Sequence, residues 1–353
     1  MTHIPRWAHA HGPVTASARI RSTPEDFHVE EILGFEADGE GEHLLLKVEK
    51  RGANTLWVAR ELARYAGVSS RDVSYAGMKD RNAVTVQHFS LWLGKHAQPD
   101  WSTHSDQEFR ILDIARHRRK LRIGSLKGNH FQIVLRDLSV PANELISKLE
   151  SIRERGVPNY FGSQRFGRDG ANIAQVEALF SGQLSLRDRK LRGLLLSTAR
   201  SLLFNAVLSR RVQEHSWDRV LAGEICMLEG SHSVFHAESV DDALIARAQT
   251  GDLHPTGPLW GKGESRVSGE VAALESSVVR DYAGFAQGLE NAGLEQARRA
   301  LRLPLKDLVW TTDTAQSLVL EFFLPAGAYA TAVLRELVNT EDLQGEYRGA
   351  ISD

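Results

Sequence analysis

The sequence predicts an α+β protein in which a helical region is inserted into a sheet domain. Three observations support this prediction: strand-like segments gather in residues 43–138, helical apolar periodicity dominates residues 186–301, and a strand-like segment returns at residues 317–324. The length of 353 residues exceeds one average domain, and 42% hydrophobic residues can fill a core. We therefore expect one large or two moderate domains and no extensive disorder.

The first strand-rich part also contains one helix. Residues 43–52, HLLLKVEKRG, alternate like a strand. Asn54 then opens a helix that runs to residue 66, with apolar residues at helical spacing, an Asn cap and a terminal Gly67. Residues 73–77 and 83–93 look like strands on either side of a turn at residues 78–82, and residues 130–138 predict a further strand.

The second half is mainly helical until the sheet pattern returns. Residues 186–214 have helical apolar periodicity with Arg on the other face, and residues 240–249 and 290–301 also look helical. Residues 317–324, SLVLEFFL, predict a strand, and residues 328–338 predict a helix after Pro325 and Gly327. No repeat of fixed period and no low-complexity tract is present.

The formal net charge of −2, from 43 basic and 45 acidic residues, hides a strong segregation of charge along the chain. Residues 25–42 are rich in Asp and Glu, whereas residues 116–127, RHRRKLRIGSLK, contain six Lys or Arg and no acid. A uniformly basic surface is excluded. A local basic surface for phosphates is not, because affinity depends on where the charge lies.

Several chemistries are disfavoured by the residues present. The single Cys226 forms no internal disulfide and no multi-thiolate zinc site. No HExxH, P-loop or GxSxG motif occurs, so we expect no catalytic metal and no nucleotide cofactor. The N-terminus lacks an apolar signal region, and no run approaches the roughly 18 apolar residues of a membrane span. We expect a soluble, unexported protein.

Four segments could carry a site, and each also has a plain structural interpretation. Asp80 lies at a turn between two cations, where it could face an anionic partner or only serve the turn. Asn129 and Phe131 follow the basic run. An amide and an aromatic ring can bind a nucleobase, or the two residues can simply belong to the start of a strand. Residues 157–167 and 324–331 could line a site or pack a junction.

Taken together, these segments resemble the TruD family of tRNA pseudouridine synthases. The resemblance covers nearly the whole chain, in order. Its matching stretches are PEDF with VEE (residues 24–31), GEGEH (39–43), AGMKDR through Thr85 and Gln87, GN with Phe131 (128–131), VPNYFGSQRFG (157–167), PTGPLWG (255–261) and LPAGAYATAVLREL (324–337).

The resemblance implies that the protein isomerises a uridine of tRNA, at position 13 in the family, to pseudouridine without metal or cofactor. Asp80 matches the family's essential Asp, and a carboxylate can attack a sugar carbon or accept a proton. Phe131 would stack on the target base and Asn129 would hydrogen-bond near it. Phe27 and Tyr329 match aromatic positions of the binding site.

Two positions depart from what is common in the family. Arg21 stands where relatives often have Lys, and we interpret it as the cation that pairs with Asp80. The forked guanidinium of Arg would then replace the compact ammonium group of Lys. Tyr329 stands where relatives can have Phe, which leaves stacking plausible and makes a role for its hydroxyl doubtful.

The target uridine of a folded tRNA must leave its stack to reach a carboxylate, so we expect base extrusion into a pocket. The basic run would bind the backbone. Its phosphate-contact candidates are Arg116, Arg118, Arg119, Lys120, Arg122 and Lys127, and a solvated face is the alternative.

The expected architecture is a pseudouridine-synthase-like α+β fold with a mixed, largely antiparallel sheet and flanking helices. Residues 1–154 and 304–353 would form a split catalytic domain, and residues 155–303 an inserted α/β domain facing it across an RNA-binding cleft. We expect tRNA as partner, no membrane or protein partner, and a cytoplasmic location.

Two other functions remain open from the residues alone. A non-catalytic RNA-binding protein would keep the basic surface without the chemistry. A carboxylate-based hydrolase of nucleosides or glycosides would need a second catalytic carboxylate near Asp80.

Overall fold

The computed structural model describes residues 4–94, 98–101 and 106–342, and the chain divides into two compact units. Unit 1 comprises Met1–Val14, Ser147–Pro304 and Ala328–Leu337. Unit 2 comprises Thr15–Ile146, Leu305–Gly327 and Val338–Asp353. This division groups residues 4–14, 147–154 and 328–337 with the middle of the chain, so it differs from the expected domain boundaries, which stay a prediction.

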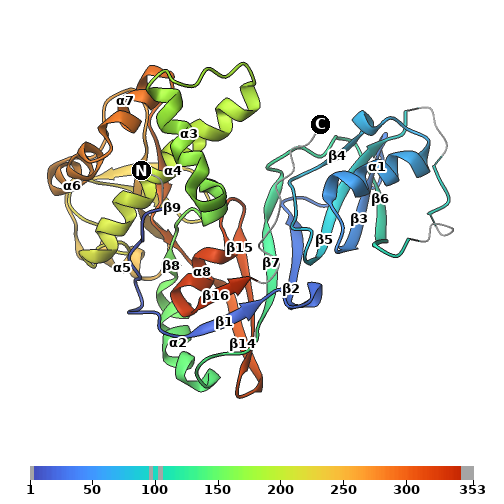
Figure 1. Cartoon of the computed structure of the whole chain (residues 1–353), viewed down its shortest axis with the longest axis horizontal. Helices are drawn as coiled ribbons and strands as arrows, with labels where there is room; N and C mark the ends of the chain where they lie inside the picture. The colour runs from blue at the N-terminus through green and yellow to red at the C-terminus, as the bar shows by residue number, and fades with distance from the viewer. Residues whose placement is uncertain (1–3, 95–97, 102–105, 343–353) are drawn as a thin grey trace. The chain divides into compact units, whose positions relative to one another are not determined.

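Unit 2 is built on an eight-stranded sheet whose strands can be followed in Figure 1. All neighbouring strands are antiparallel except the parallel pair β2 and β5. The expectation of a mixed, largely antiparallel sheet is therefore confirmed. In spatial order the strands are β14 (Lys306–Thr314), β15 (Ser317–Pro325), β7 (Leu126–Leu135), β2 (Phe27–Leu33), β5 (Val84–Trp92), β3 (His43–Arg51) and β6 (Phe109–His117), with β4 (Val73–Tyr75) also paired to β5.

Helix α1 (Thr55–Ala66) covers part of one face of this sheet, over β3 to β6. Period-two alternation places Leu44, Leu46 and Val48 of β3 on that face, where they join one apolar cluster with α1 residues such as Leu62. The Asn54 side chain accepts a hydrogen bond from the Leu56 amide (2.8 Å), and Gly67 ends the helix in the left-handed region. The expected strand and helix at residues 43–66 are both present.

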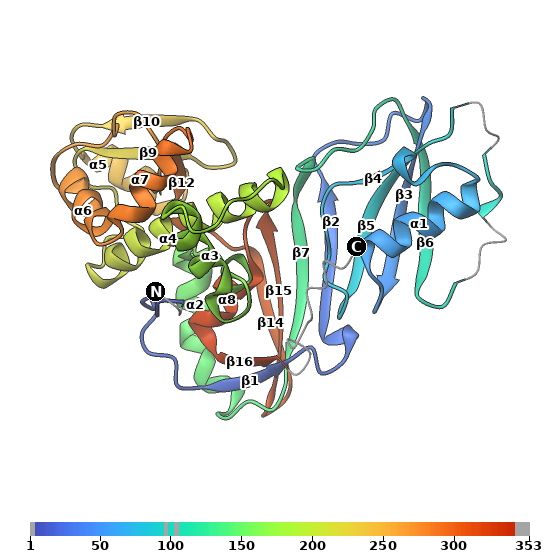
Figure 2. The same ribbon diagram turned by 45° about the horizontal axis from the view of Figure 1, so that its top comes forward.

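Several strands of unit 2 are absent from the sequence prediction. The acidic segment includes β2, an interior strand with the buried Glu31, and the basic run begins inside β6, an edge strand with several exposed residues. A separate parallel pair joins β1 (Ser17–Ile20) to β16 (Asn339–Asp342), as Figure 2 shows. Distant parts of the chain therefore complete unit 2.

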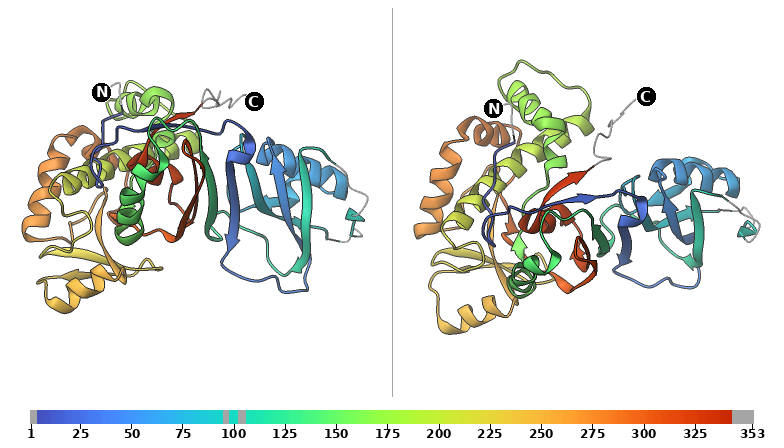
Figure 3. Two further views of the ribbon diagram at one scale, coloured as in Figure 1. Left: turned by 90° about the horizontal axis from the view of Figure 1, so that it is seen from below. Right: turned by 60° about the horizontal axis from the view of Figure 1, so that its bottom comes forward.

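Unit 1 packs helices around a central one, α4 (Arg189–Gln213). Helices α6 and α7, orange in Figure 3, pack against it. The other helices are α2 (Ile146–Arg155), α3 (Ala171–Phe180), α5 (Asp242–Gln249), α6 (Gly269–Arg280), α7 (Ala283–Asn291) and α8 (Ala330–Leu337). Within the described ranges, α4 alone is long and apolar enough to cross a membrane, and 67% of the tested stretch is buried in the structure.

Unit 1 also contains strands. A four-stranded sheet has the order β10 (Val234–Ala237), β9 (Glu224–Leu228), β11 (Leu253–Leu259) and β12 (Ala297–Ala300). A two-stranded sheet joins β8 (Val157–Pro158) to β13 (Arg302–Leu303). Short 3₁₀ helices in the described parts of both units are η1 (Pro24–Asp26), η2 (Ser70–Asp72), η4 (Ala142–Leu145), η5 (Ser163–Phe166) and η6 (Arg168–Gly170). An α/β character for the middle of the chain agrees with these elements.

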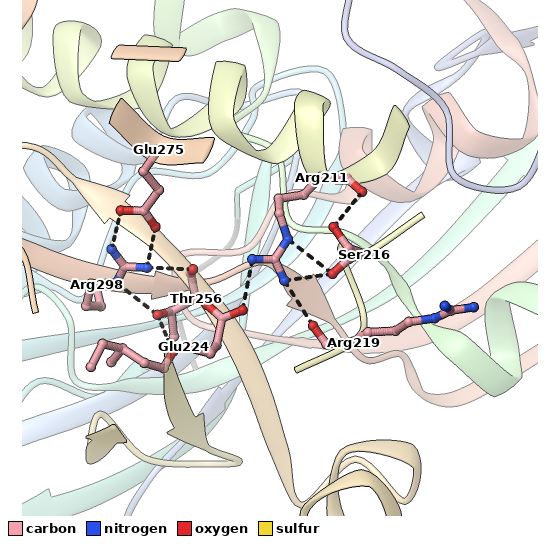
Figure 4. Close-up of polar contacts among 8 residues, drawn as sticks. Arg211, Ser216, Arg219, Glu224, Thr256, Glu275 and Arg298 are labelled. Atoms are coloured by element: carbon pink, nitrogen blue, oxygen red, sulfur yellow. Dashed lines mark hydrogen bonds and ion pairs between the residues drawn. The ribbon is translucent and has the colours of Figure 1, made fainter. Parts of the chain in front are cut away.

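The helix expected at residues 290–301 is wrong. Helix α7 ends at Asn291, Gly293 takes a left-handed φ of +78°, and residues 297–300 form β12 on the edge of β11. In Figure 4, the Arg298 guanidinium binds both carboxylate oxygens of Glu275 and also the hydroxyl and carbonyl oxygens of Thr256. These buried contacts and the sheet pairing outweigh the helical propensity of the segment.

Candidate active site

Asp80 lies on the loop between β4 and β5, and its side chain is 59% exposed. The Arg21 Nη2 atom lies 2.9 Å from Asp80 Oδ2. Arg21 follows β1 directly, has a left-handed φ of +56°, and places its guanidinium 4.1 Å from the centre of the Phe27 ring. A strained backbone and a ring together orient the cation toward the carboxylate.

Lys79, the neighbour of Asp80, belongs to a different set of contacts. Its Nζ lies 2.8 Å from Glu31 Oε1 and donates to Asn129 Oδ1 at 2.9 Å. Glu31 and Asn129 are directly paired residues of β2 and β7, so they project on the same face of the sheet. Lys79 therefore joins the loop to the sheet and does not pair with Asp80.

Glu31 is a buried carboxylate that anchors this lysine. Its Oε2 accepts a hydrogen bond from the backbone amide of His88 at 2.8 Å. Burial alone would raise the pKa of Glu31, but the contacts with His88 and Lys79 outweigh it and lower the pKa. Glu31 is therefore ionised at neutral pH, and the buried charge of Lys79 is matched.

The backbone of the Asp80 loop is held from inside unit 2 by Lys50. Lys50 is fully buried, and its Nζ donates to the carbonyl oxygens of Asp80 (2.8 Å) and Ala53 (2.9 Å). Burial lowers the pKa of Lys50 to about 8, against the opposing effect of the Asp80 carboxylate. Lys50 thus fixes the main chain of the residue whose side chain stays exposed.

Two further buried side chains hold the same loop. Gln87 Nε2 donates to the Gly77 carbonyl at 2.8 Å, and Gln87 Oε1 accepts from the Thr55 hydroxyl at 3.0 Å. The Thr55 hydroxyl oxygen in turn accepts from the Lys79 amide at 3.2 Å. Backbone groups at residues 77, 79 and 80 are therefore satisfied by strand and helix residues, which preorganises the loop.

The predicted aromatic residues Phe27 and Phe131 form one cluster on this face. Their rings meet edge to face with centres 6.2 Å apart, and Phe131 also stacks on Phe322 at 5.5 Å. Phe27 is 3% and Phe131 is 8% exposed. Most of each ring therefore belongs to the core of unit 2, and a base would meet only the small part that remains accessible.

Tyr329 belongs to unit 1, whereas the other predicted substrate-binding residues belong to unit 2. The Tyr329 hydroxyl oxygen accepts a hydrogen bond from Arg165 Nη2 at 2.6 Å, and its ring meets Phe161 edge to face. The Arg299 guanidinium lies 4.3 Å from the centre of the Phe161 ring, and burial lowers the pKa of Arg299 to about 10. The hydroxyl thus has a definite partner.

The six phosphate-contact candidates fall into two groups. Arg116 donates to the Gly41 carbonyl, Arg118 pairs with Glu40, and Lys120 donates to the Arg71 carbonyl. Arg119, Arg122 and Lys127 are exposed and have no ion pair or side-chain hydrogen bond in the part of the chain that the structure describes. The acidic segment therefore already neutralises part of the basic run, and the second group is the better phosphate surface.

Sequence reasoning assigned no role to Lys50, Thr55, Gln87 and Glu31. A signal for Lys50 was present, because the buried positions 44, 46 and 48 of the strand continue to position 50.

Among the described residues, no group of three or more His, Cys, Asp or Glu is placed to hold a metal ion. The absence of a metal or cofactor stays a prediction.

Comparison with known proteins agrees with this fold. Residues 11–185 and 171–337 match the family described as tRNA pseudouridine synthase D (TruD). The tRNA pseudouridine synthase D of Nitrosococcus oceani is 50% identical over 341 residues, covering 96% of this chain and 95% of that protein. The protein of the same name from Xanthomonas euvesicatoria is 48% identical, with 94% of both chains covered.

A solved structure has the same fold at low sequence identity. The crystal structure of the putative tRNA pseudouridine synthase D (TruD) from Methanosarcina mazei superposes with a TM-score of 0.75 at 23% identity, covering 96% of each chain. These matches place the chain in the class of pseudouridine synthases, which are isomerases. Within that class, the chain belongs to the TruD family.

Proposed function

We propose that this protein converts a uridine of tRNA, at position 13, to pseudouridine through the carboxylate of Asp80. The observation that supports this proposal best is the contrast within one loop. The Asp80 side chain is open to solvent and paired to Arg21, while its backbone is fixed by the buried Lys50. An exposed carboxylate on a rigid backbone is suited to meet a large substrate.

The isomerisation exchanges one bond to the sugar for another. The bond between C1′ and N1 of uracil breaks, a bond between C1′ and C5 forms, the C5 proton is lost, and N1 gains a proton. Asp80 acts from its ionised form, whether it attacks C1′, adds to the ring or removes a sugar proton. Arg21 pairs with the carboxylate and orients it.

The detached base must be held while it turns. The Asn129 side-chain oxygen is engaged by Lys79, which leaves its NH₂ group to donate to a uracil carbonyl. The accessible part of the Phe27 and Phe131 cluster supplies an apolar contact for the base. We infer that the uridine is extruded from the RNA to reach these groups, and that the enzyme acts on tRNA in the cytoplasm.

A single incubation distinguishes this proposal from the two alternatives. Purified protein is incubated with transcribed tRNA and no added cofactor, and pseudouridine, free uracil and bound RNA are measured. We expect pseudouridine at one position and no free uracil. Binding without conversion would favour a non-catalytic RNA-binding protein, and release of uracil would favour a hydrolase; either result contradicts the proposal.

A further inference from the structure

Ile123 has the greatest exposure among the large apolar side chains of the described residues, at 83%. A single exposed apolar side chain is ordinary on a protein surface. The setting of Ile123 is less ordinary, because it lies between Arg122 and Gly124 in the basic run. Its local backbone and its neighbours indicate a defined role.

Ile123 is held at the tip of a tight turn. The Ser125 amide donates to the Arg122 carbonyl at 3.1 Å, and Gly124 has a φ of +86°, which are the features of a type II turn with Ile123 as its second residue. The Ser125 hydroxyl also accepts from the Arg122 amide and donates to the Arg122 carbonyl. The turn therefore presents Ile123 outward on a fixed backbone.

This turn is fastened to the start of the Asp80 loop. The Gly124 amide donates to the Ala76 carbonyl at 3.1 Å, and Leu121 packs with Ala76 and Leu45 in one apolar cluster. Met78, between Ala76 and Asp80 in sequence, is itself 54% exposed. Two exposed apolar side chains thus lie on two segments that are hydrogen-bonded to each other, and Met78 is two residues from Asp80 in the sequence.

The charges around the turn identify the class of partner. Arg119, Arg122 and Lys127 are exposed cations that flank Ile123 in sequence and form no ion pair within the described ranges of the chain. Cations suit phosphates, and an apolar side chain between them can enter a base stack, as apolar wedges do in proteins that unstack bases. A partner protein with an apolar surface would make no favourable contact with the three cations, so RNA is the partner that fits this surface.

We propose that Ile123 is a wedge that enters the RNA stack beside the target uridine and occupies the space that the extruded base leaves. Met78 lines the path of that base toward Asp80. The proposal rests on the proposed function, since it assigns the step that delivers the uridine to the carboxylate. It adds a specificity for folded RNA, because unpaired, unstacked uridine needs no wedge.

The test uses tRNA with the fluorescent base 2-aminopurine next to the target uridine. The fluorescence of 2-aminopurine rises when the neighbouring base unstacks. Fluorescence and single-turnover conversion are measured at saturating protein for the wild type, Ile123→Ala and Ile123→Met. Val309→Ala is the control, because Val309 is 53% exposed on β14 outside both loops. We expect Ile123→Ala to lose the fluorescence rise and about tenfold in turnover, while Ile123→Met and the control keep both.

Two results would overturn the wedge. One is a normal fluorescence rise and normal turnover for Ile123→Ala at saturation; the other is weaker RNA binding as its sole defect, which would make Ile123 a simple contact. If the wild type raises fluorescence but makes no pseudouridine, the proposed function fails while the comparison with Ile123→Ala still decides the wedge. Circular dichroism of each variant verifies folding.

Discussion

Individual residues of this site differ in how far sequence could identify them. Asp80 is one acid among 45, and its turn position alone favours no catalytic role, so only the family resemblance singles it out. The pairing with Arg21 joins residues 59 positions apart in the sequence, and it depends on a left-handed backbone at an arginine, which no local rule predicts. Long-range contacts of this kind require the folded chain.

The Tyr329 hydroxyl is a second case, because its partner became visible only in the structure. Tyr329→Phe leaves the Arg165 donor without its 2.6 Å acceptor. We expect the free energy of unfolding to fall by about 1–2 kcal/mol, because the desolvation cost of the Arg165 donor is then offset by no hydrogen bond. Turnover should change less than about twofold, because the aromatic ring remains. Urea denaturation and conversion assays measure both.

The matched control for that substitution is Tyr282→Phe. Tyr282 also belongs to unit 1, and its hydroxyl has no hydrogen-bond partner among the residues that the structure describes. An equal loss of stability in the two variants would contradict a stabilising role for the Arg165 contact.

At the scale of elements, strong local signals were predictive and weak ones were not. The helix after Asn54 has its cap, its apolar periodicity and its terminal glycine together, and it forms as expected. The segment 290–301 has helical propensity, yet pairing with β11 and the buried bonds of Arg298 make its end a strand. Strands β2 and β6 were missed because their charged residues, including the buried Glu31 of β2, break the alternation of apolar and polar residues.

The Asp80 loop gives a prediction for its buried support. Lys50→Met removes the donor from two carbonyl groups, so we expect at least about a tenfold loss of turnover with tRNA binding retained. Lys47→Met is the control, because Lys47 lies on the same strand but its pair with Glu30 is partly exposed. Equal activity of the two variants would contradict the assigned role.

The same lysine predicts a pH dependence of stability. The pKa of Lys50 is about 8 in the folded protein and near its ordinary 10.5 when unfolded, so the unfolded chain binds more protons between these values. The wild type should therefore gain stability relative to Lys50→Met as the pH rises from about 8 to 10.5. Urea denaturation across that range measures the difference, and a constant difference would contradict the burial of a charged lysine.

For the molecule as a whole, the near-neutral net charge conceals an uneven distribution. Arg118 pairs with Glu40 and Arg116 donates to the Gly41 carbonyl, whereas Arg119, Arg122 and Lys127 form no ion pair among the described residues. The sequence shows an acidic and a basic stretch, but not which cations the acidic stretch neutralises, because that depends on the pairing of β3 with β6. Charge counted along the chain therefore overestimates the free basic surface.

The distribution predicts how salt affects RNA binding. Replacing Arg119, Arg122 and Lys127 together by Ala should make the slope of log affinity against log salt shallower by about 2, since three phosphate contacts are lost. Replacing Arg118 should change the slope by less than about half a unit, because Glu40 already matches its charge. Equal changes in the two variants would remove the exposed group from the interface.

Conversion of transcribed tRNA by Asp80→Asn measures whether the Asp80 carboxylate carries the isomerisation. Asp113→Asn, an exposed acid on β6, is the control. We predict no pseudouridine above background for Asp80→Asn, with tRNA affinity within about threefold of the wild type, and normal conversion by the control. Pseudouridine formation by Asp80→Asn at the wild-type rate would show that the reaction does not depend on this carboxylate.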